Sequence, residues 1–202
     1  MRTDTLVGIQ DDRPTPPVPY PAARGQSRRG DRIVTASGVA FWPLDPLPAE
    51  IRLSDIASAL SKLCRFGGHI EGDVAYSVAQ HSVLVALSLP QHLRTQGLLH
   101  DAAEAYLVDV PRPIKKYLVN YEVIEARLAA AIGDRFGLEL CDLPPEVKLA
   151  DERALMTEKR DLLVPPPFKW GNAEPWKARI QPWSPGEARK AFLGLAGKLG
   201  LR

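Results

Sequence analysis

Three chemically capable side chains, His100, Asp101 and Glu104, interrupt the apolar stretch 98–106. On a helix, His100 and Glu104 lie one turn apart on the same face, and His100 and Asp101 are separated by about 100° of rotation. An adjacent imidazole and carboxylate can therefore both reach one metal ion. Charged groups among leucines and alanines are costly unless they are paired or bound to a cation. The stretch predicts a metal site for which other parts of the chain supply further ligands.

Two more side chains are candidates for that ligand set. His81 lies inside a mostly apolar helix predicted from residue 77, and Asp151 interrupts the apolar pattern of a helix predicted from Pro144. A single buried histidine is more often a hydrogen-bonded core residue, and Lys148 with Asp151 also has the spacing of a surface ion pair. Together with the doublet at 100 and 101, however, the set offers two imidazoles and two carboxylates. Such mixed N/O donors suit Zn²⁺, Co²⁺, Mn²⁺ or a similar ion better than Ca²⁺.

A divalent ion in this setting would support hydrolysis. It lowers the pKa of a bound water, and Glu104 is placed to orient that water or to relay its proton. Arg65, Lys115 and Lys148 could neutralise the charge that develops in phosphoryl transfer. The chain has no Walker-type loop, no Gly-x-Ser-x-Gly turn and no Cys-x-x-Cys pair, so the corresponding nucleotide-binding, esterase and redox classes are disfavoured.

The composition is that of a globular protein. The chain has 202 residues, of which 45% are hydrophobic and 25% charged, and this suits one sizeable domain. A net charge of +2 does not indicate binding to a nucleic-acid polymer. The sequence shows no apolar leader and no long apolar run, and it contains only two cysteines. We therefore expect a reduced, cytoplasmic protein without a membrane segment.

The pattern along the chain predicts an all-α domain of about six helices with a small N-terminal β-hairpin and irregular termini. Residues 1–30 are proline- and arginine-rich and predict a flexible arm; residues 31–202 form the domain, with its core at 54–163. Ser37-Gly38 marks the hairpin turn. Three tryptophans in a proline-rich connector are expected to be packing anchors. The predicted helices cover residues 54–65, 77–87, 90–108, 121–136, 144–163 and 185–199.

The candidate ligands also occur in a recognisable order. His81, the doublet His100-Asp101, and Asp151 resemble the H…HD…D pattern of the HD-domain metal phosphohydrolases. The segments 77–82, 100–104 and 109–115 are most similar to those of bacterial 5′-deoxynucleotidases and related phage deoxyadenosine triphosphate triphosphohydrolases. The likeness covers residues 54–163. It implies that the four residues bind the metal ion and that the domain is a single HD-type helical bundle.

The resemblance also implies roles for other positions. Glu104 would assist the attacking water, and Asp109 would be a second catalytic or substrate-orienting carboxylate. Arg65 and Lys115 would contact phosphate, with Lys148 as a further candidate. Membership of the family would also imply a homodimer or a higher homo-oligomer.

One position departs from the pattern. The 5′-deoxynucleotidases have a tryptophan beside the pocket arginine, whereas this chain has Phe66 followed by two glycines, and Phe66 is the expected substrate contact at that place. The base and sugar preference is therefore open. The expected function is release of phosphate from deoxynucleoside monophosphates. The alternatives are a deoxynucleoside triphosphate triphosphohydrolase, an inactive nucleotide-binding regulator, and a purely structural helical protein.

Overall fold

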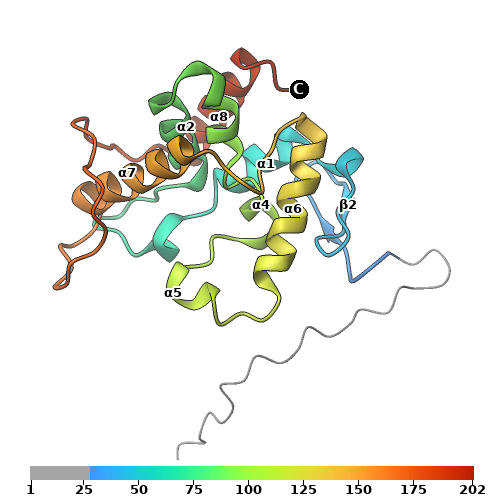
Figure 1. Cartoon of the computed structure of the whole chain (residues 1–202), viewed down its shortest axis with the longest axis horizontal. Helices are drawn as coiled ribbons and strands as arrows, with labels where there is room; N and C mark the ends of the chain where they lie inside the picture. The colour runs from blue at the N-terminus through green and yellow to red at the C-terminus, as the bar shows by residue number, and fades with distance from the viewer. Residues whose placement is uncertain (1–27) are drawn as a thin grey trace, which may run out of the picture.

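The computed structural model describes residues 28–202, and in that range the regular secondary structure is almost entirely helical (Figure 1). It starts with a two-stranded antiparallel hairpin, β1 (Ile33–Val34) and β2 (Ala40–Phe41), in which Ile33 pairs with Phe41. Gly38 has a φ of +82° in the turn, a conformation that glycine adopts without strain. The prediction of an all-α bundle with a small N-terminal hairpin is confirmed.

The predicted arm, residues 1–30, lies outside the described residues except at its end. There Arg28 stacks over Trp42, with its guanidinium carbon 4.3 Å from the ring centroid, and it forms ion pairs with Asp45 and Glu50. The folded body therefore includes Arg28, whereas the sequence placed its start at residue 31.

Helices account for most of the remaining chain. Their bounds, including short 3₁₀ turns, are η1 (Pro48–Glu50), α1 (Leu53–Leu60), η2 (Arg65–Gly68), α2 (Val78–Ser88), η3 (Gln91–Leu93), α3 (Arg94–Leu99), α4 (Glu104–Leu107), α5 (Arg112–Lys115), α6 (Tyr121–Phe136), α7 (Pro145–Leu162) and α8 (Pro185–Lys198). Within residues 28–202, no helix combines the length and the apolar character needed to cross a lipid bilayer.

Helix α2 is the centre of the fold. It is buried on almost all sides and contacts α3, α7 and α8, while α1 contacts α4 and α8. Figure 1 shows α2 and α8 side by side, with α7 and α6 at the flanks. The main core cluster includes Phe41 of the hairpin, Leu98 of α3 and Phe192 of α8. A histidine on α2 therefore lies in the middle of the molecule.

Ser77 followed by Gln80 three residues later has the pattern of a capping box, and the start of α2 follows that pattern only in part. The Ser77 hydroxyl accepts a hydrogen bond from the backbone N–H of Gln80, as expected of an N-cap. The expected return bond from the Gln80 side chain is not made. Its amide instead donates to the carbonyl of Gln181 at 2.7 Å and accepts from the N–H of Trp183 at 2.8 Å. Gln80 therefore fastens the C-terminal connector to α2.

Helix α1 also starts differently from the prediction. It begins at Leu53 after Arg52, without a side-chain cap, and neither Ser54 nor Asp55 fills that role. The Asp55 carboxylate accepts two hydrogen bonds of 2.7 Å from the N–H and hydroxyl of Ser37. The hairpin turn offers Asp55 partners outside its own helix, and this contact fixes the hairpin on α1.

The predicted helix 90–108 is interrupted at His100 and Asp101, two of the predicted metal ligands. α3 ends at Leu99 and α4 begins at Glu104, and between them the N–H groups of Ala102 and Glu104 donate to the carbonyls three residues earlier. Such bonds make a tighter turn than an α-helix. His100 and Asp101 therefore lie in a tight turn between two helical pieces, and Val108, with a φ of +66°, ends the second piece.

Candidate metal centre

Three segments distant in sequence bring four side chains to one point. α2 contributes His81, the turn after α3 contributes His100 and Asp101, and α7 contributes Asp151. His81 Nε2 lies 3.2 Å from His100 Nε2 and 3.2 Å from Asp151 Oδ1, and the ligand atoms of these three residues are within 4.8 Å of one another. Asp101 Oδ2 lies 3.2 Å from His100 Nε2 and 3.5 Å from His81 Nε2.

These separations suit a metal ion. Ligand atoms about 2.1 Å from an ion are about 3.0 to 3.4 Å apart when they are adjacent in octahedral or tetrahedral coordination. The group of His81, His100 and Asp151 could therefore hold a metal ion, with Asp101 beside it. The fold itself therefore brings two imidazoles and two carboxylates to one point.

The imidazoles of His81 and His100 both direct Nε2 toward the centre. His81 Nδ1 lies 2.6 Å from Glu158 Oε1, and His100 Nδ1 lies 2.8 Å from the carbonyl of Gly97. Because a carboxylate and a carbonyl only accept hydrogen bonds, each Nδ1 carries the proton. Each Nε2 then has its lone pair directed at the centre when the ring is neutral.

The charges of the centre shift the pKa values of its members. Burial alone would raise the pKa of Asp151, but the hydrogen bond and charge of His81 lower it to about 2. The pKa of Asp101 is likewise lowered, since the neighbouring imidazoles and Arg65 outweigh its burial. Burial and Arg65 act to lower the pKa of His81, yet Glu158 and Asp151 raise it to about 9. Without a metal, protons on the imidazoles balance the carboxylates.

Glu104 lies beside the centre in a different electrostatic state. Only 8% of the residue is exposed, and its Oε2 is buried with no hydrogen-bond partner within the described part of the chain. Burial, followed by the charges of Asp101 and Asp109, raises its pKa to about 10. The pKa of Asp109 is also raised, first by burial. Because buried polar atoms are normally hydrogen-bonded, this oxygen is expected to bind a water or a substrate atom next to the centre.

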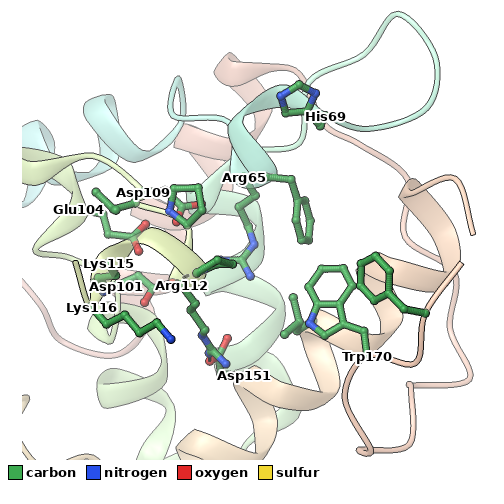
Figure 2. A pocket seen from close by; sticks show the side chains of 16 residues that line it. Arg65, His69, Asp101, Glu104, Asp109, Arg112, Lys115, Lys116, Asp151 and Trp170 are labelled. Carbon is green, nitrogen blue, oxygen red and sulfur yellow. Dashed lines mark hydrogen bonds and ion pairs between the residues drawn. The ribbon is translucent and has the colours of Figure 1, made fainter. Parts of the chain in front are cut away.

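A cavity of about 800 Å³ opens onto this centre. Figure 2 shows Asp101, Glu104 and Asp109 on one side of Arg65 and Trp170 on the other. Arg65, Phe66, Glu104, Asp109 and Lys115 line it together with Asp101 and Asp151. The structure thus places five of the six predicted catalytic and substrate-contacting residues around one cavity.

Lys148 is the exception. Its side chain is 59% exposed and its Nζ lies 3.0 Å from Asp142 Oδ1, so it does not line the cavity. Lys148 was predicted as a candidate phosphate contact, with a surface ion pair to Asp151 as the alternative. Its partner is instead Asp142, just before α7. Asp151 pairs with Arg112, whose Nη2 lies 3.0 Å from Oδ2, so the two oxygens of Asp151 face different partners.

Comparison with known proteins shows the family to which the chain belongs. The chain is 38% identical over 165 residues to "Uncharacterized protein YfdR" of Escherichia coli, covering 80% of this chain and 91% of that protein. The chain belongs to the YfdR family. It is also 41% identical over 126 residues to "Uncharacterized protein RCAP_rcc00048" of Rhodobacter capsulatus, covering 58% of this chain and 64% of that protein. No family model matches the chain.

In this YfdR-family chain, a short turn holds the pocket arginine in place. The N–H of Arg65 donates to the carbonyl of Tyr76 at 2.9 Å, and the backbones of Cys64 and Ser77 pair in an isolated antiparallel β-bridge at the start of α2. Phe66 has a φ of +56°, which is uncommon for a residue with a side chain. The Arg65 guanidinium lies 5.5 Å from the centroid of the Phe66 ring. The strained turn therefore directs both side chains to the cavity.

The sequence reasoning missed Trp170 as a cavity residue. It lines the cavity opposite the metal centre, and its ring meets Phe66 edge-on at a centroid distance of 6.2 Å. Lys159 donates to the Trp170 carbonyl at 2.9 Å. The next residue, Gly171, packs so closely on α7 that a Cβ there would collide with the thioether of Met156. An irregular connector offers no periodicity from which this placement could be predicted.

Glu158 is the second residue that was missed, and it is fully buried. Arg65 Nε donates to its Oε2 at 3.1 Å, and the Tyr76 hydroxyl and His81 Nδ1 donate to its Oε1 at 3.0 and 2.6 Å. Arg112 and Lys116, both cavity residues, were also not proposed as contacts. For Glu158 a signal existed, because it follows Asp151 by seven residues and so shares its helix face.

Proposed function

We propose that this protein is a metal-dependent nucleotide phosphohydrolase of the HD-domain type. The preferred reaction is release of phosphate from a deoxynucleoside monophosphate. The observation that carries the proposal is the convergence of His81, His100, Asp101 and Asp151 at the floor of a cavity whose walls hold both cations and aromatic rings.

The donor set fits a transition-metal ion or Zn²⁺. It provides two neutral nitrogens and two carboxylate oxygens, which suit Mn²⁺, Co²⁺ or Zn²⁺ and leave room for water and a substrate oxygen. When bound, such an ion supplies Lewis-acid polarisation of water and of the phosphate. Glu104 lies within the same cavity, and within the described residues its Oε2 has no hydrogen-bond partner. A cation bound at the centre would offset the negative charges that raise the pKa of Glu104, and the ionised carboxylate could then accept the proton of the attacking water.

The cationic side chains suit a phosphate group. Arg65 Nη1 lies 3.6 Å from Asp101 Oδ2, so the guanidinium borders the centre directly. Lys115 lines the cavity on the side of Glu104 and Asp109. A phosphate between Arg65 and Lys115 has its developing charge stabilised from both sides. The bidentate geometry of arginine also fixes the orientation of the phosphorus.

The aromatic wall suits a nucleobase. Trp170 lies across the cavity from Asp101, Glu104 and Asp109 (Figure 2). Its ring meets that of Phe66 edge-on, and Phe66 and Phe168 also line the cavity. Stacking on aromatic rings accepts any base, because every base has a planar face. A nucleotide with its phosphate at the centre and its base on this wall makes use of both halves of the cavity.

Incubation of metal-loaded protein with dAMP and with dATP tests the proposal. We expect inorganic phosphate from dAMP in the presence of Mn²⁺, Co²⁺ or Zn²⁺. The metal-free protein, prepared with a chelator, is the control. If neither nucleotide is consumed with any of these ions, the assignment as a nucleotide phosphohydrolase is wrong.

One observation favours a second candidate, a deoxynucleoside triphosphate triphosphohydrolase. Arg112 and Lys116 add two cations to the cavity beyond Arg65 and Lys115, and a longer phosphate chain would use them. The same experiment separates the two reactions, since this activity releases inorganic triphosphate from dATP and leaves dAMP intact. A nucleotide-binding regulator without turnover would bind dAMP or dATP and release neither product.

A further inference from the structure

We propose that Glu158 is a positioning residue that links the metal centre to the phosphate-binding arginine. It fixes the tautomer of His81 through one oxygen and the orientation of Arg65 through the other. This inference rests on the proposed metal site but not on the identity of the substrate.

The position of Glu158 on α7 makes the link possible. Asp151 and Glu158 are seven residues apart, so both point from the same face of α7, two turns from each other. Asp151 approaches His81 at Nε2, and Glu158 approaches it at Nδ1. One helix therefore holds the imidazole at both of its nitrogens.

The hydrogen bonds of Glu158 determine which nitrogen is available to a metal. Its Oε1 lies 2.6 Å from His81 Nδ1 and 3.0 Å from the Tyr76 hydroxyl, and its side chain is fully buried. An ionised carboxylate accepts only, so the ring donates from Nδ1 and coordinates through Nε2. Carboxylate partners of ligand histidines fix ring orientation and increase ligand basicity.

The second oxygen acts on Arg65. Arg65 Nε donates to Oε2 at 3.1 Å, while Nη1 of the same guanidinium lies 3.6 Å from Asp101 Oδ2 and the residue lines the cavity. A buried carboxylate that only balanced the charge of Arg65 would not need the short contact to His81. Glu158 makes both contacts and therefore fixes the position of the His81 ring relative to the Arg65 guanidinium.

The test is the metal affinity of Glu158→Gln. Its amide matches the carboxylate in shape, but the NH₂ group must face either His81 or Arg65, where it meets another donor. Zn²⁺ affinity of the metal-free protein, measured by calorimetry or by competition with a chromophoric chelator, is expected to fall about 10- to 100-fold. The matched control is Asp161→Asn, which alters another buried carboxylate on α7 that contacts Arg160 and Arg179 and not the centre.

The outcomes are distinct. Unchanged Zn²⁺ affinity in Glu158→Gln, or an equal loss in Asp161→Asn, would overturn the proposal, because either result makes the role of Glu158 purely structural. If Glu158→Gln does not fold, long-range ¹H–¹⁵N correlation spectra of the Zn²⁺-loaded wild-type protein decide. We expect the His81 proton on Nδ1; coordination through Nδ1 would refute the role. Wild-type protein that binds Zn²⁺ as described but hydrolyses no nucleotide would refute the proposed function alone.

Discussion

The carboxyl group of Glu104 differs from the other acidic groups around it. Asp101 and Asp151 lie against imidazoles and have lowered pKa values, whereas Glu104 is buried beside Asp101 and Asp109 and its pKa is raised to about 10. A carboxyl group with such a raised pKa carries a proton at neutral pH, and it can act as a base once a bound cation lowers that pKa toward neutrality. The environment therefore separates ligand carboxylates from the proton-transfer carboxylate within one site.

Glu104→Gln tests that role. We expect kcat for dAMP to fall about 10²- to 10⁴-fold, the contribution typical of a general acid or base. KM should change little, because the side chain has no role in holding the phosphate. Elemental analysis should show unchanged metal content, since Glu104 is not among the predicted ligands. An unchanged rate would remove Glu104 from the mechanism.

Trp170→Ala tests the aromatic wall. Loss of one stacking partner should raise KM for dAMP about 5- to 100-fold, with hydrolysis of deoxyribose 5-phosphate unaffected because it has no base. Trp176→Ala is the matched control, since Trp176 belongs to the same connector but packs on the cluster of Val85 and Val147. It should lower stability and leave KM unchanged. An equal rise in KM for both substrates would show that Trp170 does not contact the base.

At the scale of residues, the site was predictable where a side chain that can bind a metal interrupts an apolar helical pattern. His81 and Asp151 stand out because each interrupts an apolar helix, and the structure brings them to the doublet at 100 and 101. Glu158 and Arg112 were missed because their partners lie 77 and 39 residues away in sequence. Lys148 was misplaced for a different reason, because its partner Asp142 is only six residues away and helical spacing does not show which of two nearby carboxylates is in reach.

At the scale of elements, helices with strong periodicity and clear ends were predictable. The predicted helix 121–136 matches α6, and Gly137 ends it in the left-handed conformation. The Ser184 cap and Pro185 begin α8 as the sequence indicates. The break at 100–103 was not predictable, because the residues there keep the apolar period while their hydrogen bonds tighten. The connector 163–184 is positioned by contacts with α2 and α7, not by its own pattern.

Helix α7 holds part of that connector through Asp161, and this contact predicts a pH-dependent stability. Its carboxylate accepts from the N–H of Ile180 at 2.9 Å and from Arg160 and Arg179. Despite its burial, these partners lower the pKa of Asp161 to about 2. A lowered folded-state pKa gives stability that is present above the unfolded pKa and is lost as the pH falls through the folded value.

Asp161→Asn should therefore lower the free energy of unfolding by about 1 to 3 kcal/mol at neutral pH, the range for hydrogen bonds to a charged group. The difference from wild type should shrink between about pH 4 and pH 2, as the wild-type carboxylate is protonated. Urea denaturation at several pH values measures it. A difference that is the same at pH 7 and pH 2 would show that the charge of Asp161 does not stabilise the connector.

At the scale of the whole molecule, the proposed metal centre joins segments that are far apart in the sequence. α2, the turn after α3, and α7 supply its donors, and the same segments meet in the core. A ligand that binds only the folded state stabilises it by mass action, because the unfolded chain cannot bring residues 81 and 151 together. The centre should therefore act as a crosslink as well as a site of chemistry.

Thermal unfolding with and without metal tests this. Zn²⁺ or Mn²⁺ at about 100 times its dissociation constant should add about 2.7 kcal/mol and raise the Tm by about 5 to 10 °C. Asp101→Ala should abolish the rise, whatever its own metal-free Tm, because it removes a ligand from the centre. Asp142→Ala is the matched control: within residues 28–202 its carboxylate pairs with the exposed Lys148 and not with the centre, so the full rise should persist. A chelator should reverse the effect in wild type. If the Tm of wild type does not respond to either ion, the four side chains do not form a metal centre, and the hydrolytic mechanism built on it fails with it.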